Sequence, residues 1–350
     1  MMLHTPTRRS AWAHGGSLRT ASALGICALG CVFALHNPDL LVDADLRAFQ
    51  STPRFVRSQL TWFDRSGKKL SVLGNMADYG NVELSPDGAQ IAVAILDDLE
   101  RGARDLWMIN AVTGRRMAFA SSPADENWLI WSRDGRRAIF NSGRSGGLDL
   151  YQEPSNGAAA AEPLLIDREA KWPVSWSSDG RYVLYVLNGQ RTSNDIWVLP
   201  LFGDKKPFPY LQTEESENWA AFSPDGKWIA YSSTASGNVE VYVAPFPATG
   251  RRARISRDGG SQARWRRDGR ELYFLSPDRE LMAVAVEAKG SEFGAATPQP
   301  LFEIRFPYGQ YHAFDVVADG QRFLVNTLVT PPGTPVIAHE GVLHLYFICT

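Results

Sequence analysis

One stretch of the sequence matches a pattern used in nucleophilic catalysis. Residues 143–147 read Gly-Arg-Ser-Gly-Gly and fit Gly-x-Ser-x-Gly, a motif in which a strained turn between a strand and a helix exposes a serine hydroxyl. Here the apolar segment 139–141 comes before the motif, but a second strand-like segment, 148–151, follows it. These neighbours indicate a hairpin loop, so a serine nucleophile at Ser145 is poorly supported.

Side chains that exchange protons near neutral pH are the other source of chemistry. His312, Glu126 and Lys171 each stand near the start of an expected strand and could act as the acid–base group of a lyase or hydrolase. No group of cysteines and histidines has the spacing of a zinc site, and neither a phosphate-binding loop nor a dinucleotide fingerprint is present. The sequence therefore predicts no metal and no cofactor, and an enzyme is the second interpretation.

A repeat supplies the elements that would position these residues. Asp-Gly pairs recur 43 to 51 residues apart, each preceded by an apolar residue and followed by a β-rich run. The pairs lie at 87–88, 134–135, 179–180, 225–226, 268–269 and 319–320. A repeat of about 40–50 residues that alternates strands with tight turns is typical of a β-propeller.

The fourth repeat shows the physical logic of one blade. Pro224 presets φ for a tight turn, Asp225 can bond to nearby backbone, and Gly226 tolerates positive φ. The runs before and after this turn predict two strands, and the segments 239–243 and 252–255 predict two more. Each repeat is therefore expected to form a four-stranded antiparallel blade.

The ends of the repeat array predict how the ring closes. A half-repeat at 59–73 has two strands and no inner pair before it, and the sixth repeat has an inner pair and one further strand at 343–347. We expect the two pieces to share one blade, which removes free sheet edges. The prediction is an all-β propeller with six blades; the alternative has seven, one of them a thin composite.

The first fifty residues do not match the repeats. Arg8, Arg9 and Arg19 precede the uncharged stretch 20–35, which predicts a short apolar helix outside the propeller, serving as a secretory signal or a membrane anchor. The alternative is a buried helix of the folded domain. We divide the chain into an N-terminal segment with linker, 1–50, and a propeller, 51–350. Only one of the three cysteines, Cys349, lies in the propeller, so no disulfide framework is expected.

The net charge of the chain argues against a nucleic-acid partner. The formal net charge is -2, whereas nucleic-acid binding needs a clustered basic surface. A local basic patch does occur in the fourth and fifth repeats, and we interpret it as solvated blade edges. Its arginines are Arg251, Arg252, Arg254, Arg264, Arg266, Arg267 and Arg270.

The repeats resemble a known group. Residues 84–88 (Leu-Ser-Pro-Asp-Gly) and 222–226 (Phe-Ser-Pro-Asp-Gly) are similar to the WD40-like (PD40) repeats of TolB-type propellers, and the resemblance covers roughly 59–350. Segments 60–68, 195–201, 203–208 and 262–269 look like the propeller region that follows the membrane segment of certain bacterial receptor serine/threonine kinases. The resemblance implies an extracytoplasmic, periplasmic sensing or interaction module. No kinase motif is present, so kinase activity does not carry over.

Alignment on the Asp-Gly pairs predicts where a partner binds. The loops that enter the inner strands should form one mouth of the central channel, with amides, charges and exposed aromatic rings that suit a peptide or small ligand. The alternative is that Trp128 and Trp219 pack between blades. The predicted ring comprises Tyr79, Asn81, Glu126, Asn127, Trp128, Lys171, Trp172, Glu217, Asn218, Trp219, Gln262, Tyr311 and His312.

These patterns favour a monomeric, non-catalytic propeller of the bacterial cell envelope that binds a protein or peptide. Besides the enzyme, a second alternative is a truncated derivative of a receptor kinase whose propeller closes poorly. Residues 20–35 would provide any membrane tether.

Overall fold

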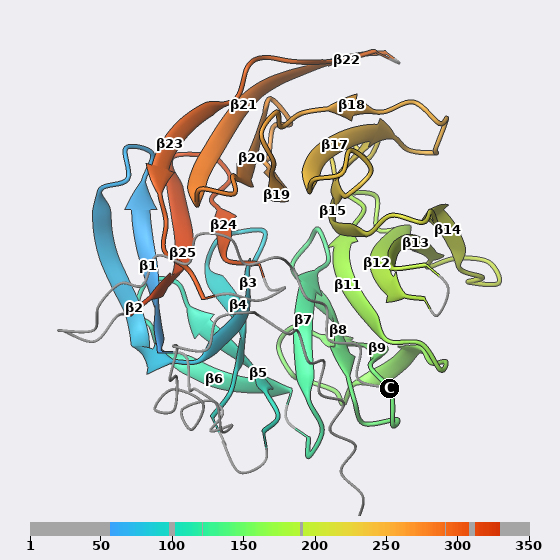
Figure 1. Ribbon diagram of the computed structural model, residues 1–350. Helices are drawn as coiled ribbons and strands as arrows, with labels where there is room; N and C mark the ends of the chain where they lie inside the picture. The colour runs from blue at the N-terminus through green and yellow to red at the C-terminus, as the bar shows by residue number, and fades with distance from the viewer. Residues whose placement is uncertain are drawn as a thin grey trace, which may run out of the picture. The chain divides into compact units, whose positions relative to one another are not determined.

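The computed structural model describes residues 57–97, 102–120, 122–189, 192–290, 292–307 and 312–329. They form an all-β propeller whose six sheets surround a central axis (Figure 1), so the six-bladed prediction is confirmed over the seven-bladed one. The predicted N-terminal apolar helix and the strand predicted at 343–347 lie outside the described residues. Within the described ranges, no helix is long and apolar enough to cross a membrane.

Four blades consist of four consecutive antiparallel strands, which follow one another from the channel outward. The first contains β3 (Tyr79–Leu84), β4 (Gln90–Ile95), β5 (Asp105–Asn110) and β6 (Arg116–Ala120). The second contains β7 (Glu126–Trp131), β8 (Arg137–Ser142), β9 (Asp149–Pro154) and β10 (Glu162–Leu165). The third contains β11 (Lys171–Trp176), β12 (Tyr182–Asn188), β13 (Asn194–Pro200) and β14 (Phe208–Leu211). The fourth contains β15 (Glu217–Phe222), β16 (Trp228–Ser233), β17 (Glu240–Pro245) and β18 (Ala253–Arg254).

The fifth blade has an extra hairpin. Its main strands are β19 (Ser261–Trp265), β20 (Glu271–Leu275), β21 (Glu280–Lys289) and β23 (Gln299–Glu303). The second half of β21 leaves the blade and pairs with β22 (Glu292–Ala295). Figure 1 shows this hairpin reaching toward β18 of the fourth blade.

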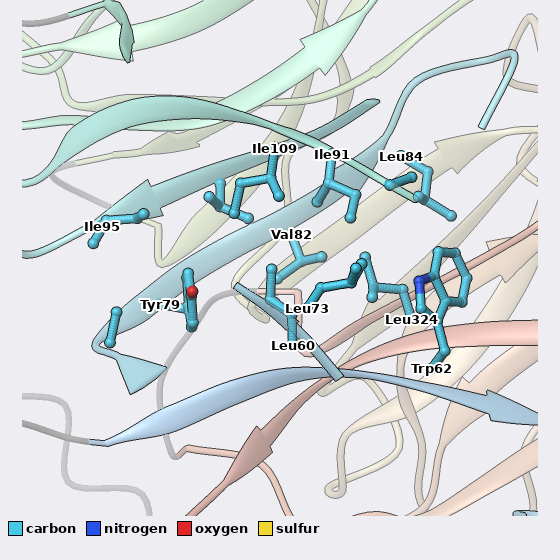
Figure 2. Close-up of a cluster of buried hydrophobic side chains, with 13 residues drawn as sticks. Leu60, Trp62, Leu73, Tyr79, Val82, Leu84, Ile91, Ile95, Ile109 and Leu324 are labelled. Carbon is cyan, nitrogen blue, oxygen red and sulfur yellow. The ribbon is translucent and has the colours of Figure 1, made fainter. Parts of the chain in front are cut away.

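The sixth blade joins both ends of the repeat array, as predicted. The order β24 (Phe314–Val316), β25 (Arg322–Leu328), β1 (Ser58–Asp64), β2 (Lys69–Ala77) places the N-terminal half-repeat outside the last inner pair. Figure 2 shows how this composite blade packs on the first: Leu60, Trp62 and Leu324 meet apolar residues of the first blade. The ring is therefore closed by ordinary antiparallel pairing and by an apolar core between blades.

Four of the six Asp-Gly turns that define the repeat share one side-chain hydrogen-bond pattern. In the first, the Ser85 hydroxyl donates to the Asp87 carboxylate at 2.6 Å and accepts the backbone N–H of Gln90 at 2.9 Å. Equivalent serine–aspartate pairs occur in the second, third and fourth turns. The turn glycines have φ of 69–73°, where a Cβ is disfavoured.

A β-bulge interrupts five of the inner strands near their starts. At three bulges a residue other than glycine is left-handed: φ is 44° at Trp128, 49° at Trp219 and 58° at Gln262. Such a residue costs about 1–3 kcal/mol and persists only when its surroundings hold it. Bulges redirect the side chains that follow, and after the bulges of β3 and β19 come Glu83 and Arg264, which line the central channel.

Candidate functional site

The predicted ring lies at the strand-entry end of the channel, but the structure buries most of it. The ring residues that are half-buried are Trp172, Asn218 and Trp219, and Tyr311 lies outside the described residues. The buried ones are Tyr79, Asn81, Glu126, Asn127, Trp128, Lys171, Glu217, Gln262 and His312. Trp128 is only 6% exposed, so it is a packing residue and not the exposed aromatic that was expected. Binding by this ring stays a prediction, carried by the half-buried residues.

Each of the two ring glutamates bonds to nearby residues through one carboxylate oxygen, whereas the other oxygen, Oε2, has no hydrogen-bond partner among the described residues. Glu126 accepts from Arg144 at 2.6 Å and from the Ser142 hydroxyl at 3.3 Å. Glu217 accepts from the hydroxyls of Thr213 at 2.7 Å and Ser233 at 3.3 Å. Burial raises the pKa of Glu217 to about 6. Both side chains therefore tie the start of an inner strand to the end of the next strand and to a loop beside it.

Lys171 is completely buried and bridges the second and third blades. Its Nζ lies 2.9 Å from the Asp149 carboxylate and 2.5 Å from that of Asp167. It also donates to the Glu169 carbonyl at 2.5 Å. Lys171, Glu126 and His312 have separate partners, so the acid–base group expected from the sequence does not assemble.

The ring amides tie neighbouring blades to the chain that enters β24. The Asn81 carbonyl oxygen accepts the backbone N–H of His312 at 3.1 Å, and Gln262 accepts that of Ala313 at 2.8 Å. Asn218 performs a similar task between the third and fourth blades, since it accepts from Asn194 at 3.0 Å. Asn127 donates locally to Asp125 at 2.6 Å.

A buried charged cluster that the sequence patterns did not predict lies farther along the axis. Arg264 binds Glu83 through two nitrogens, at 2.6 and 3.4 Å, and its Nε lies 3.9 Å from Asp315. Arg264 also contacts His312 Nδ1 at 2.6 Å. Because arginine can only donate, Nδ1 is the acceptor and the proton of a neutral ring is on Nε2. We call Glu83, Arg264, His312 and Asp315 the axial cluster; the first blade, the fifth blade and the chain leading into and through β24 contribute to it.

The axial cluster borders a central hollow at the Asp-Gly-turn end of the channel. This axial pocket has a volume of about 450 Å³ and receives residues from all six blades. Its walls include the rings of Trp131, Trp176, Phe222 and Trp265, and Glu83, Arg264 and Asp315 are the charged groups deepest in it. Exposed Arg133 and Arg267 stand at the Asp-Gly turns that form its rim. The axial pocket is therefore at the opposite end of the inner strands from the predicted ring.

Burial changes the protonation of the axial cluster. It raises the pKa of Glu83 to about 7, with a further contribution from Asp315 and an opposing one from Arg264. Burial, with Arg264 nearby, holds the pKa of His312 well below its usual range. The cluster thus combines a neutral imidazole with a carboxyl that can change charge near neutral pH.

Glu83 should make stability depend on pH. Its raised pKa means that the folded state holds this proton more tightly than the unfolded state, so stability falls as pH rises from about 4.5 through about 7. Glu153, with a pKa of about 7, and Glu217, with one of about 6, act in the same direction. We expect Tm to fall between about pH 5 and pH 8, and the fall to be shallower in Glu83→Gln. The exposed control Glu162→Gln should keep the parent slope, and an unchanged slope in Glu83→Gln would refute the assignment.

Within the part of the chain that the structure describes, neither the Ser145 motif nor a group of metal ligands provides further chemistry. The 143–147 motif forms a turn between β8 and β9, as expected, and the Ser145 hydroxyl is bonded to Asp149 instead of to a histidine. Within those same ranges no three histidine, cysteine or acidic side chains gather as metal ligands would.

Sequence comparison finds no matching protein-family model and no matching curated protein. Comparison of folds does find similar structures. A TolB-type protein from Agrobacterium tumefaciens has a TM-score of 0.62 at 17% identity, over 79% of this chain and 99% of that one. The nidogen/laminin complex gives 0.51 at 8% identity, over 65% and 89%. An oligogalacturonate lyase in complex with manganese gives 0.50 at 11% identity, over 78% and 97%. At these identities the likeness establishes a TolB-like propeller fold, which is shared by binding proteins and enzymes alike.

Proposed function

We propose that this chain is a non-catalytic binding propeller of the bacterial cell envelope, which holds a protein or peptide partner as a sensor or scaffold. The observation that carries the proposal is the axial pocket. Its volume falls within the roughly 300–1,000 Å³ of common ligand sites, and half-exposed rings of Trp176 and Trp265 line it beneath a rim bearing arginines. Tryptophan and arginine are the residues that most often dominate binding energy.

The envelope location rests on the N-terminus and on the family resemblance. The uncharged stretch 20–35 after Arg8, Arg9 and Arg19 suits a cleaved signal or a tether. The receptor-kinase resemblance supports an extracytoplasmic sensing role for a monomer. A poorly closed kinase remnant is disfavoured, because β1 pairs with β25 along its whole length and so closes the ring.

Affinity capture with variants tests the proposal. Full-length protein carrying Arg133→Glu and Arg267→Glu reverses two exposed rim charges, and Arg115→Glu with Arg168→Glu makes the same charge change at exposed sites elsewhere. A partner captured from a solubilised envelope extract should be recovered equally by parent and control, and at least about tenfold less by the rim variant. No partner on any bait, or equal recovery on all three, would contradict binding at the axial pocket.

One observation favours an enzyme as the second candidate. Glu83 has a pKa of about 7 and borders a pocket, and such a carboxyl can give and take protons at physiological pH. Turnover of any substrate that is lost in Glu83→Gln, with folding retained, would favour this candidate over the binding module.

A further inference from the structure

The axial pocket has opposite charge in its depth and at its rim. The charged residues that line it are four acids and four arginines. Two carboxylates and one guanidinium, those of Glu83, Asp315 and Arg264, belong to inner strands and lie deepest. The others lie in or directly beside the Asp-Gly turns and leave the rim with one more positive than negative group. These rim residues are Asp87, Arg133, Arg267, Asp319 and Arg322.

Arg264 compensates only one of the two deep carboxylates. Its guanidinium binds Glu83 at 2.6 and 3.4 Å, whereas its Nε lies 3.9 Å from Asp315 and has no hydrogen-bond partner among the described residues. Asp315 is held by backbone N–H groups, that of Leu84 at 2.7 Å and that of Val316 at 2.8 Å. With both carboxylates ionised, the depth of the pocket therefore has one surplus negative charge.

This surplus charge borders the pocket and is not cancelled by its other neighbours. The side chains of Glu83 and Asp315 are 15% and 12% exposed, and both line the hollow. His312, 4.0 Å from Glu83, is neutral because burial and Arg264 hold its pKa well below the usual range. A carboxylate in such a place takes up a proton or binds a cation. Burial raises the pKa of Glu83 to about 7 against the opposing effect of Arg264, so proton and cation compete near neutral pH.

The walls favour an organic cation. Within the described ranges no three histidine, cysteine or acidic side chains gather as metal ligands would. The half-exposed rings of Trp176 and Trp265 line the same hollow, and indole is the best aromatic partner for an ammonium group. Both rings are anchored, since their N–H groups donate to the carbonyls of Gly180 at 3.3 Å and Ala221 at 3.1 Å. A lysine side chain fits these walls, because its alkyl stem packs on rings while its ammonium donates to carboxylates.

The rim restricts what can accompany this lysine. Arg133 has no hydrogen bond or ion pair within the part of the chain that the structure describes. Arg267 donates to the Pro86 carbonyl at 2.5 Å and lies near Asp87. Asp87 and Asp319 also accept backbone N–H groups of their own turns. Because the positive rim repels a ligand that is only cationic, acidic groups beside the lysine are needed to match it.

We propose that the axial pocket binds a lysine side chain of the partner, carried on a segment with acidic residues on either side. The ammonium group replaces the proton of Glu83 and lies between Glu83 and Asp315, while the flanking carboxylates face Arg133 and Arg267. The Glu83 proton passes to solvent and the lysine stays charged. This assignment rests on the proposed function, since it names the group that the axial pocket holds.

Isothermal titration calorimetry on the full-length protein tests this proposal. The probe is the acetylated and amidated peptide Glu-Glu-Gly-Lys-Gly-Glu-Glu. At pH 8 we expect a Kd of about 10–100 µM, and a Kd at least about tenfold weaker when norleucine replaces the lysine. Ionised Glu83 falls to about one-tenth of the total at pH 6, so binding should be about tenfold weaker there than at pH 8. Buffers of different ionisation enthalpy should reveal the release of about one proton per peptide at pH 6.

Glu83→Gln leaves Arg264 and Asp315 in balance, and it should remove the proton release and the pH dependence. It should also weaken the lysine peptide at least about tenfold at pH 8. The exposed control Glu162→Gln should keep the parent affinity within about twofold, together with the pH response. The norleucine comparison uses the parent protein alone, so it remains decisive if Glu83→Gln does not fold.

Four results would overturn the proposal. They are no binding of the lysine peptide, equal affinity for the norleucine peptide, affinity that increases as pH falls, and tighter binding of the free diamine cadaverine than of the peptide. Equal binding of both peptides that is lost in Arg133→Glu with Arg267→Glu would reject the lysine but keep the axial pocket as a binding site. Equal binding of both peptides that survives this rim variant would contradict the proposed function as well.

Discussion

Gly320→Ala is expected to lower the free energy of unfolding by about 2–5 kcal/mol. Gly320 has φ of 72°, and a Cβ there would lie 2.3 Å from the Tyr273 hydroxyl and 2.8 Å from Cδ of Arg266. The left-handed conformation costs an alanine about 1–2 kcal/mol, and overpacking adds about 1–3 kcal/mol. The strain falls on a network that closes the ring, because Arg65 of the composite blade donates to Glu271, Tyr273 and the Gly320 carbonyl.

Gly180→Ala is the matched control for this prediction. Gly180 occupies the same turn position with φ of 73°, but a Cβ there meets nothing within 4 Å. It should cost only the conformational part, about 1–2 kcal/mol. Thermal unfolding of both variants at one scan rate measures the difference. Equal Tm values would mean that a Cβ at position 320 meets no more steric hindrance than one at position 180, contrary to the structure.

Lys171→Met should lower the free energy of unfolding by about 3–5 kcal/mol, since it removes one partner of a buried ion pair. Asp149, whose side chain is 2% exposed, would keep its charge in the interior without the ammonium group 2.9 Å away. Burial opposes the charge of Asp149, but hydrogen bonds from Ser145 and Lys171 hold its pKa below the usual value.

The matched control is Arg168→Met, which removes an exposed cation three residues earlier and should change stability by less than about 0.5 kcal/mol. Chemical or thermal unfolding of both variants, followed by circular dichroism, gives the comparison. If Lys171→Met has the same unfolding midpoint as the parent, Lys171 is not a bridge between blades. Its predicted place in a binding ring would then regain support.

The fold could be predicted from the sequence because its signal is local and repeated. Each Asp-Gly turn, such as Asp225-Gly226, fixes a strand pair within about ten residues, and six such units at one period define the blades. The composite blade was also predictable, since the half-repeat at 59–73 lacked the inner strands that the last repeat supplies.

The site was harder to predict because its contacts are not local. Glu83 and Arg264 are 181 residues apart in sequence and meet only when the ring closes. At their position in the repeat the other blades have Ile130, Ser175, Ala221 and Asp315, so no residue type recurs to mark it.

The predicted ring shows that exposure was also hard to predict from the sequence. Glu126 and Lys171 are charged, which suggested solvent exposure, but both are buried with charged partners from nearby strands and loops. A polar residue in a sequence does not reveal whether its partner is water or protein. The left-handed bulges at Trp128, Trp219 and Gln262 were equally invisible, since none of these residues favours positive φ.

Site-specific photocrosslinking tests the central claim, binding at the axial pocket, most directly. A benzophenone side chain would replace Ser178, which lines the axial pocket, Trp172, at the strand-entry end, or Val112, 86% exposed on an outer turn. We predict that the partner retained by the parent protein crosslinks from position 178 and not from position 112. Crosslinking from position 172 alone would place the partner at the strand-entry ring, and crosslinking from position 112 alone would place it off the axis; either result would contradict binding at the axial pocket.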